Sequence, residues 1–319
     1  MHIFVTGASG FVGSRLVQVL AARADTRVTV AARGRHFTCA TAERVVRFED
    51  LATASFSAEL SGVDAVVHCA ARVHVMNDLE ANPLHAFRVV NVEGTLNVAR
   101  QAAEAGVRRF VFLSSIKVNG EGTEPGVPFT ADQPGNPVDP YGVSKMEAEQ
   151  RLRELALTTG MEVVIIRPVL VYGPGVKANF LSMMRWLHKG LPLPFGAIHN
   201  ARSLVALDNL VDLTVLCLSH PAAANQTFMV SDGEDLSTTA LLRKMASALE
   251  RPARLLPVPA VLLNAAARML GKRSLSQRLC GSLQVDIAKT RAVLGWMPPL
   301  SVEQALKLTA SDYMENEKK

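Results

Sequence analysis

The 319-residue sequence predicts an α/β fold, a doubly wound parallel sheet with a smaller C-terminal region. Three observations support this prediction. A strand-like segment at the start of the chain runs into a glycine-rich turn, strand-like and helix-like segments then alternate as far as residue 172, and prolines interrupt the alternation beyond it. Parallel strands joined by right-handed helical crossovers form a sheet with helices on both faces. We therefore expect a sheet region over residues 1–172 and a second region over 173–319, interleaved with the last strands of the sheet.

The first element is a short β-branched and aromatic strand starting at His2, followed by three glycines and a helix over residues 14–24. Gly7 permits a tight turn, Gly10 lets a pyrophosphate approach the backbone, and Gly13 lets the helix pack close to the strand. The helix N-terminus offers free N–H groups to phosphate. This context favours a dinucleotide site over a purely structural turn. The predicted contacts are Gly7, Ser9, Gly10, Phe11, Val12 and Gly13.

The remaining elements follow from the period of the apolar residues. Further strands are expected over residues 27–31, 44–48, 65–69, 110–113 and 163–167, and one more over 227–230 in the second region. Helices are expected over residues 84–105 and 145–158. Ligands of such sheets bind at the carboxyl ends of the strands. We therefore expect polar residues that follow strands to lie together at one edge.

Composition narrows the classes of function. The formal charge of +5 is modest and no Lys/Arg block with interleaved aromatics occurs, so an anionic small substrate is expected and nucleic acid is not. The most nearly membrane-like run, residues 258–270, is interrupted by Pro259, Asn264 and Arg268, so no stable membrane insertion is expected. The sequence begins with the first strand and leaves no room for a secretion signal, which favours the cytoplasm.

Four cysteines lie far apart in the sequence, at Cys39, Cys69, Cys217 and Cys280. They form no Cys-x-x-Cys pair, which disfavours a metal site or a redox motif. We expect buried, reduced thiols, as in cytosolic proteins.

Candidate acid–base chemistry starts at Tyr141 and Lys145, a phenol and an ammonium four residues apart. If Tyr141 opens a helix, as Pro140 before it allows, both side chains share one helix face. A free phenol has a pKa of about 10, and bringing it toward 7 means stabilising the phenolate by about 4 kcal/mol. A lysine cation and an oxidised nicotinamide could supply that field. The alternative is a surface tyrosine and an exposed lysine.

Ser115 favours the catalytic interpretation. With Ser114 it ends the strand at 110–113, where a hydroxyl can hydrogen-bond a substrate carbonyl or alcohol beside the phenol. The alternative is that both serines satisfy backbone groups where the strand stops. A loop rich in Pro and Gly, residues 119–140, separates Ser115 from Tyr141, and loops of this length are usually functional.

Together these motifs resemble the extended short-chain dehydrogenases/reductases, within the NAD-dependent epimerase/dehydratase family that acts on nucleotide sugars. The resemblance covers nearly the whole chain and rests on residues 6–13, 68–71, 91–95, 114–115, 141 with 145, 167–168, 172–175, 202–212 and 294–296. It implies a Rossmann fold, a nicotinamide cofactor and a nucleotide-sugar substrate. It also implies a homodimer paired through the helices over 84–105 and 145–158.

The resemblance implies roles for single residues. Tyr141 would be the acid/base, Lys145 would lower its pKa and hold the nicotinamide ribose, and Ser115 would orient the reacting oxygen. Further cofactor contacts would be Asp50 and Leu51 near the adenine, Ala70, Ala71, Asn91 on the helix that supports the site, and Pro168. Substrate contacts would be Lys117 near the pocket, with Asn179 and Arg202 at the pyrophosphate. A helix cap for Asn179 and a surface position for Arg202 are the alternatives.

The cofactor preference depends on residues 30–35. An NAD enzyme of this fold normally has an acidic residue about 20 positions after the glycines, where it accepts from the ribose 2′-hydroxyl. Here the segment contains Arg33 and Arg35 and no carboxylate. Two guanidinium groups can clamp a 2′-phosphate, so the sequence favours NADP(H). NAD(H) remains the alternative if both arginines are solvated.

Ile116 and Lys117 argue against one reaction of the family, the elimination of water. Dehydratases of the family carry an Asp-Glu pair at these two positions, which supplies the acid and the base of the elimination, and this sequence lacks that pair. Two reactions at the sugar C4 remain. The expected one is NADP(H)-linked reduction of a 4-keto group in surface-polysaccharide sugar synthesis, and the alternative is 4-epimerisation of a UDP-hexose of the UDP-glucose or UDP-N-acetylglucosamine type. Asn119 replaces the tyrosine usual in well-known UDP-galactose epimerases, which argues against that assignment.

Overall fold

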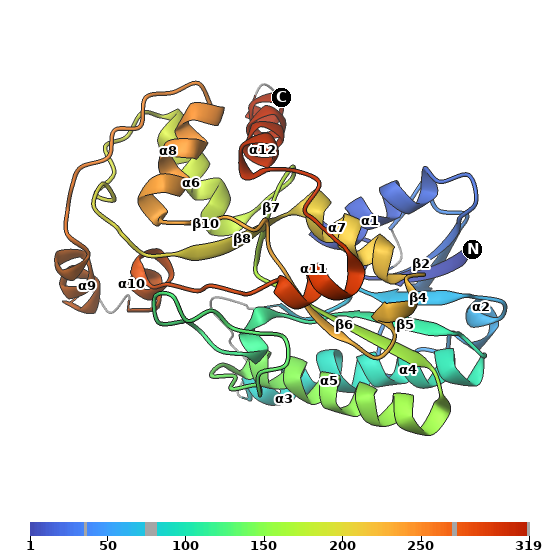
Figure 1. Ribbon diagram of the computed structural model, residues 1–319. Helices are drawn as coiled ribbons and strands as arrows, with labels where there is room; N and C mark the ends of the chain where they lie inside the picture. The colour runs from blue at the N-terminus through green and yellow to red at the C-terminus, as the bar shows by residue number, and fades with distance from the viewer. Residues whose placement is uncertain (35–36, 74–81, 270–272, 318–319) are drawn as a thin grey trace.

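A computed structural model describes residues 1–34, 37–73, 82–269 and 273–317, and its main feature is a seven-stranded sheet (Figure 1). The strand order is β3-β2-β1-β4-β5-β6-β9, and all neighbours are parallel. The strands are β1 (His2–Thr6), β2 (Arg27–Arg33), β3 (Arg44–Phe48), β4 (Ala65–His68), β5 (Arg109–Leu113), β6 (Glu162–Pro168) and β9 (Thr227–Val230). The order reverses between β1 and β4, which is where ligands bind in such sheets. The predicted doubly wound α/β fold is confirmed.

Helices cover both faces of this sheet because alternate strand residues point in opposite directions. In β1, Ile3 and Val5 pack into one core and Phe4 into the other. The first core contains residues of α1 (Phe11–Ala21) and α7 (Leu207–Cys217), and the second contains residues of α2 (Ser57–Leu60), α4 (Thr95–Glu104) and α5 (Pro140–Thr159). Figure 1 shows α4 and α5 beneath the sheet, with α1, α7 and α11 (Ala288–Leu294) above it.

The second region is built around a small sheet and a third core. The small sheet has the order β10-β8-β7, with β7 (Leu170–Tyr172), β8 (Arg202–Ala206) and β10 (Asp235–Leu236). The third core contains residues of α6 (Ala178–His188), α8 (Thr238–Ala248) and α12 (Val302–Glu317). Two further helices, α9 (Ala260–Met269) and α10 (Arg273–Cys280), lie at the left edge of Figure 1. The division at residue 172 stays a prediction, and β9 and α7 from beyond it belong to the layers of the large sheet.

Three helix boundaries differ from the predictions. The first helix begins at Phe11 rather than at residue 14, directly after Gly10 as its N-cap. The predicted helix over 84–105 consists of α3 (Pro83–Arg88), a π-helical turn (Val89–Gly94) and α4. The helix predicted from residue 145 begins at Pro140, because the Asp139 side chain caps it by accepting from Gly142 N at 2.6 Å.

The four cysteines form no disulfide within the described chain, but only Cys217 is buried, and the other three are half-buried. Among the described residues, no helix is both long enough and apolar enough to cross a membrane.

Candidate active site

The glycine turn joins β1 to α1 at the carboxyl edge of the large sheet. Gly7 has φ +72°, and a Cβ there would lie 2.6 Å from the Ala70 nitrogen. A Cβ on Gly13 would lie 2.2 Å from the Gly7 carbonyl oxygen. Both positions therefore require glycine. In the described structure no side chain caps Gly10 and no acidic residue stands in the first turn of α1, so the turn fits the diphosphate of a dinucleotide.

The other predicted cofactor contacts follow the neighbouring strands. Leu51 is buried against the π-helical turn, where a Cβ on Gly94 would lie 3.1 Å from the Leu51 side chain. Asp50 is exposed and accepts from Ala52 N at 2.9 Å. Pro168 is the last residue of β6, and Ala70 and Ala71 follow β4. Arg33 is exposed at the end of β2, and Arg35 lies outside the described residues.

Ser115, Tyr141 and Lys145 come together beside this turn. Ser115 follows β5, Tyr141 is the second residue of α5, and their hydroxyls are hydrogen-bonded. Lys145 lies one turn further along α5 and is 1% exposed. Its Nζ donates to the Leu113 carbonyl at 2.8 Å and lies 4.4 Å from the centroid of the Phe112 ring. An exposed lysine on an amphipathic helix is therefore excluded.

Burial controls the protonation of both groups. It raises the pKa of Tyr141 to about 12, while the Ser115 hydrogen bond opposes this rise and the charge of Asp139 adds to it. Burial also lowers the pKa of Lys145 to about 8, against the Cys69 and Glu149 charges, which act to raise it. Lys145 is therefore an ammonium at neutral pH. The phenol pKa lies above its ordinary value, opposite to the lowering expected from Lys145 alone.

A hydrogen-bonded chain that starts at Asn91 supports α5, and the sequence indicated Asn91 near the site but not its partner Ser144. Asn91, in the π-helical turn, donates to Ser144 Oγ at 2.9 Å, and Ser144 Oγ donates to the Tyr141 carbonyl at 2.8 Å. Asn91 also exchanges two hydrogen bonds with the Arg72 backbone, at 2.8 and 3.0 Å. The π-helical turn thus places one amide side chain between the end of β4 and the catalytic helix.

His68 extends this chain to the glycine turn. Its Nδ1 lies 3.0 Å from Thr6 Oγ1, and its Nε2 lies 3.0 Å from Thr95 Oγ1. Because Thr95 Oγ1 donates to the Asn91 carbonyl at 2.8 Å, we assign the ring proton to Nε2. Burial, with the Lys145 charge, lowers the pKa of His68 to about 3, so the ring is neutral.

A buried ion pair lies on the other side of Lys145. Glu149, one turn beyond it, binds Arg167 of β6 through two contacts, Nε–Oε1 at 2.9 Å and Nη2–Oε2 at 2.5 Å. Ser114 Oγ donates to the same carboxylate at 2.6 Å, and Arg167 Nη1 donates to Asn119 Oδ1 at 3.0 Å. One carboxylate thus connects α5, β5 and β6 at the site. Only the spacing Tyr141-Lys145-Glu149 could have suggested it.

The three predicted substrate contacts occupy different settings. Lys117 forms ion pairs with Glu121 and, at 3.4 Å, with Asp139. Asn179 is exposed in the first turn of α6; Lys177 holds the N-cap position, so Asn179 is not the cap. Arg202, in β8, is half-buried and donates to the Gly281 carbonyl at 3.0 Å.

Arg202 faces charges from two other segments. Burial lowers the pKa of Arg202, as does the nearby charge of Arg278, whereas Glu121 acts to raise it. Glu121 belongs to the loop over 119–140, which pairs with the segment 282–286 through Thr123 N to Ser282 O and Phe129 N to Gln284 O, both at 2.9 Å. This loop therefore connects the catalytic helix to the second region.

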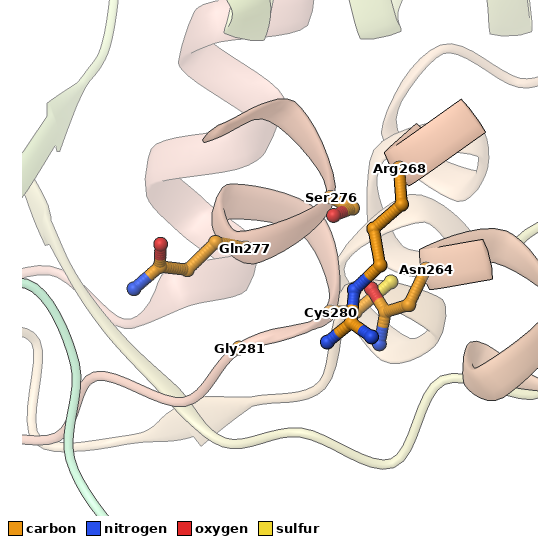
Figure 2. Close-up of a pocket in the computed structure, with 6 residues that line it drawn as sticks. All are labelled: Asn264, Arg268, Ser276, Gln277, Cys280 and Gly281. Atoms are coloured by element: carbon orange, nitrogen blue, oxygen red, sulfur yellow. The ribbon is translucent and has the colours of Figure 1, made fainter. Parts of the chain in front are cut away.

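A pocket of about 460 Å³ lies between α9 and α10, lined by Asn264, Arg268, Ser276, Gln277, Cys280 and Gly281. Figure 2 shows Asn264 and Arg268 of α9 reaching toward Cys280 of α10, while Gln277 points away. The pocket adjoins Arg202 through Gly281, whose carbonyl accepts from that guanidinium.

The glycine turn, the reversing sheet and the Ser115–Tyr141–Lys145 group define a nicotinamide-dependent enzyme of the extended short-chain dehydrogenase/reductase type. The chain belongs to the NAD dependent epimerase/dehydratase family, whose model matches residues 3–231. It is 50% identical over 315 residues to a UDP-glucose 4-epimerase of Vibrio cholerae, covering 98% of this chain and 95% of that protein.

Two solved structures share the fold. UDP-glucuronic acid 4-epimerase from Bacillus cereus in complex with NAD has a TM-score of 0.79 at 20% identity, covering 100% of this chain and 98% of that one. RMD from Pseudomonas aeruginosa complexed with NADPH has a TM-score of 0.74 at 24% identity, covering 98% of this chain and 99% of that one. Similar folds thus hold either dinucleotide, and they establish no preference for NADP(H).

Proposed function

We propose that this enzyme is a UDP-hexose 4-epimerase that interconverts UDP-glucose and UDP-galactose. The observation that carries the proposal is the 50% identity to the Vibrio cholerae UDP-glucose 4-epimerase, which extends over nearly the whole of both chains. This similarity favours 4-epimerisation over the 4-keto reduction expected from the sequence alone.

The proposed roles follow from the geometry around Tyr141. In its phenolate form, Tyr141 would accept the proton of the sugar 4-hydroxyl. The phenol formed in that step would later return the proton to the same oxygen, while Ser115 holds that oxygen by a hydrogen bond. When bound, an oxidised nicotinamide supplies the hydride acceptor for C4 and a positive charge that favours the phenolate. The Lys145 ammonium adds a second positive charge, and its contact with the Leu113 carbonyl fixes its position.

The surroundings of Lys117 support epimerisation over elimination of water. Ile116 is buried, and Lys117 is paired with Glu121 and Asp139. An ammonium and an alkyl side chain thus occupy the two positions where an elimination needs a carboxylic acid and a carboxylate.

The position of Asn119 is compatible with a UDP-hexose epimerase. Asn119 is buried, accepts from Arg167 at 3.0 Å and donates to the Thr130 carbonyl at 3.4 Å. The Asn119 side chain therefore belongs to the buried hydrogen-bond network of the Glu149–Arg167 ion pair. An asparagine in place of a tyrosine at this buried position concerns internal packing.

For the substrate diphosphate we propose Arg202, with Arg278 beside it. Two guanidinium groups whose charges disfavour each other are stabilised by an anion between them. Asn179, exposed at the first turn of α6, is proposed as a weaker contact to the same group. The cofactor proposed for the epimerase is NAD, bound along residues 7–13 and beside Asp50, Leu51, Ala70, Ala71, Asn91 and Pro168. In this proposal Arg33 is a solvated residue.

The decisive experiment uses the purified chain with UDP-galactose and no added cofactor. We expect UDP-glucose to form without net change in nicotinamide absorbance, and acid extraction to release NAD. Oxidation of added NADPH by a UDP-4-keto-hexose, without interconversion of UDP-galactose and UDP-glucose, would overturn the proposal in favour of the reductase. UDP-N-acetylglucosamine in a parallel reaction tests the breadth of the sugar site.

We further propose the homodimer that the family resemblance implies. Helices α4 and α5 lie side by side on one face of the large sheet (Figure 1). Sedimentation equilibrium of the purified chain should give twice the mass of 34.4 kDa, and a monomer at all concentrations would contradict the pairing.

A further inference from the structure

Helix α9 exposes apolar side chains along one side. Val261, Leu262 and Met269 are 77%, 59% and 89% exposed, and no residue of the helix is buried. Ala265 and Ala266 are exposed as well. At 100° per residue these five positions form one contiguous stripe on the helix surface.

The polar residues of α9 lie at one edge of this stripe, where Arg268 and then Asn264 follow Val261 around the helix. Asn264 and Arg268 line the pocket shared with α10, and Figure 2 shows their side chains directed toward Cys280. A surface helix of a water-soluble domain normally turns its apolar side to the core and its polar side to water. In α9 an apolar stripe is exposed instead, which indicates that something other than water contacts the outer side.

The charge of the chain segment that contains α9 favours one chemistry for that contact. Residues 251–285 contain six Lys and Arg and no Asp or Glu, whereas the whole chain carries a net charge of only +5. Arg251, Arg254 and Arg268 are exposed. An apolar stripe flanked by basic residues is the pattern of helices that lie in the headgroup region of anionic bilayers.

We propose that the outer side of α9 docks this enzyme on an anionic phospholipid surface. Val261, Leu262 and Met269 would enter the headgroup–acyl boundary, and the arginines would contact lipid phosphates. A second copy of the chain is a poorer occupant, because two copies of a segment that carries only basic charges would approach one another. The proposal concerns attachment to one side of the membrane and does not depend on the proposed reaction.

The test is co-sedimentation of the full chain with vesicles of phosphatidylcholine mixed with phosphatidylglycerol, and with vesicles of phosphatidylcholine alone. We expect binding to the mixed vesicles that weakens at high salt, and little binding to the neutral ones. Leu262→Gln should lower the partition coefficient about tenfold, and adding Met269→Gln should lower it further. The matched control is Leu308→Gln, an exposed leucine of α12, which should bind as the unchanged chain does.

Thermal unfolding of each variant keeps the test interpretable, since exposed positions should leave the melting temperature unchanged. The proposal is overturned if the unchanged chain stays in the supernatant with both kinds of vesicle, or if the α9 double variant binds as well as the control. It is also overturned if the double variant abolishes a dimer while vesicles have no effect, because a second copy would then be the occupant.

Discussion

Along the carboxyl edge of the large sheet, charged and polar side chains are buried, whereas on α9 apolar side chains are exposed. His68, Asn91, Lys145 and Glu149 are almost inaccessible to water, and each has hydrogen-bond partners on other elements. Unpaired, such groups would be costly to bury, so their partners hold the site in one arrangement. Helix α9 has no buried residue and lacks such constraints. The difference indicates that precise positioning is concentrated at the reaction site, and that the α9 edge faces something outside the protein.

The largest expected effect is on turnover. Tyr141→Phe removes the proposed proton carrier, and we expect kcat for UDP-galactose to fall about 1,000-fold. The ring should keep its place against Phe87, 6.0 Å away between centroids, so the melting temperature should stay near that of the unchanged chain. Tyr313→Phe, in α12, is the matched control with unchanged kcat. A Tyr141→Phe enzyme within twofold of the unchanged one would refute the assigned role.

Breaking the buried ion pair should give the largest loss of stability. Glu149→Gln leaves Arg167 buried without its carboxylate and should lower the free energy of unfolding by about 3–5 kcal/mol, measured with urea. Glu147→Gln is the control on the same helix, because Glu147 pairs with Arg88 at the surface, where a pair contributes about 0–1 kcal/mol. Equal losses in the two variants would remove the contrast between buried and surface pairs.

His68 should make stability depend on pH. Its pKa is about 3 in the folded chain and about 6.5 when unfolded, so the unfolded chain takes up the proton first. The contribution of the neutral ring is complete above pH 6.5 and is lost as the pH falls, by about 1.4 kcal/mol per pH unit. His68→Gln should flatten this slope. Parallel stability curves for both proteins between pH 5 and 8 would contradict the buried neutral ring.

The smallest effect is expected on α9. Leu262→Ala should change the free energy of unfolding by less than about 0.5 kcal/mol, because the side chain already faces solvent. Leu152→Ala, a fully buried leucine of α5, should cost about 2–5 kcal/mol in the same urea experiment. A large loss at Leu262 would mean that α9 packs on the protein, and would weaken the membrane proposal.

Much of the fold could be predicted from local pattern. The strands at 44–48 and 227–230 occur where they were expected, and the others differ by one or two residues at their ends, because apolar period depends on neighbours in the sequence. The glycine turn and the Tyr141–Lys145 pair could be predicted equally well, because a single tight turn determines the first and a single turn of helix determines the second. The π-helical turn at Asn91 could not be predicted, because its partners Arg72 and Ser144 come from other elements.

Short stretches of sequence thus determined the reacting side chains, the parallel sheet and the family, because in them spacing alone places one group beside the next. Tertiary structure decided which groups are buried. Burial raised the pKa of Tyr141 and lowered the pKa of His68. The tertiary structure also paired Glu149 with Arg167 and left the apolar side of α9 exposed. The physical reason is that desolvation depends on every element packed around a group, and helical period shows that a helix has two sides without showing which one meets water.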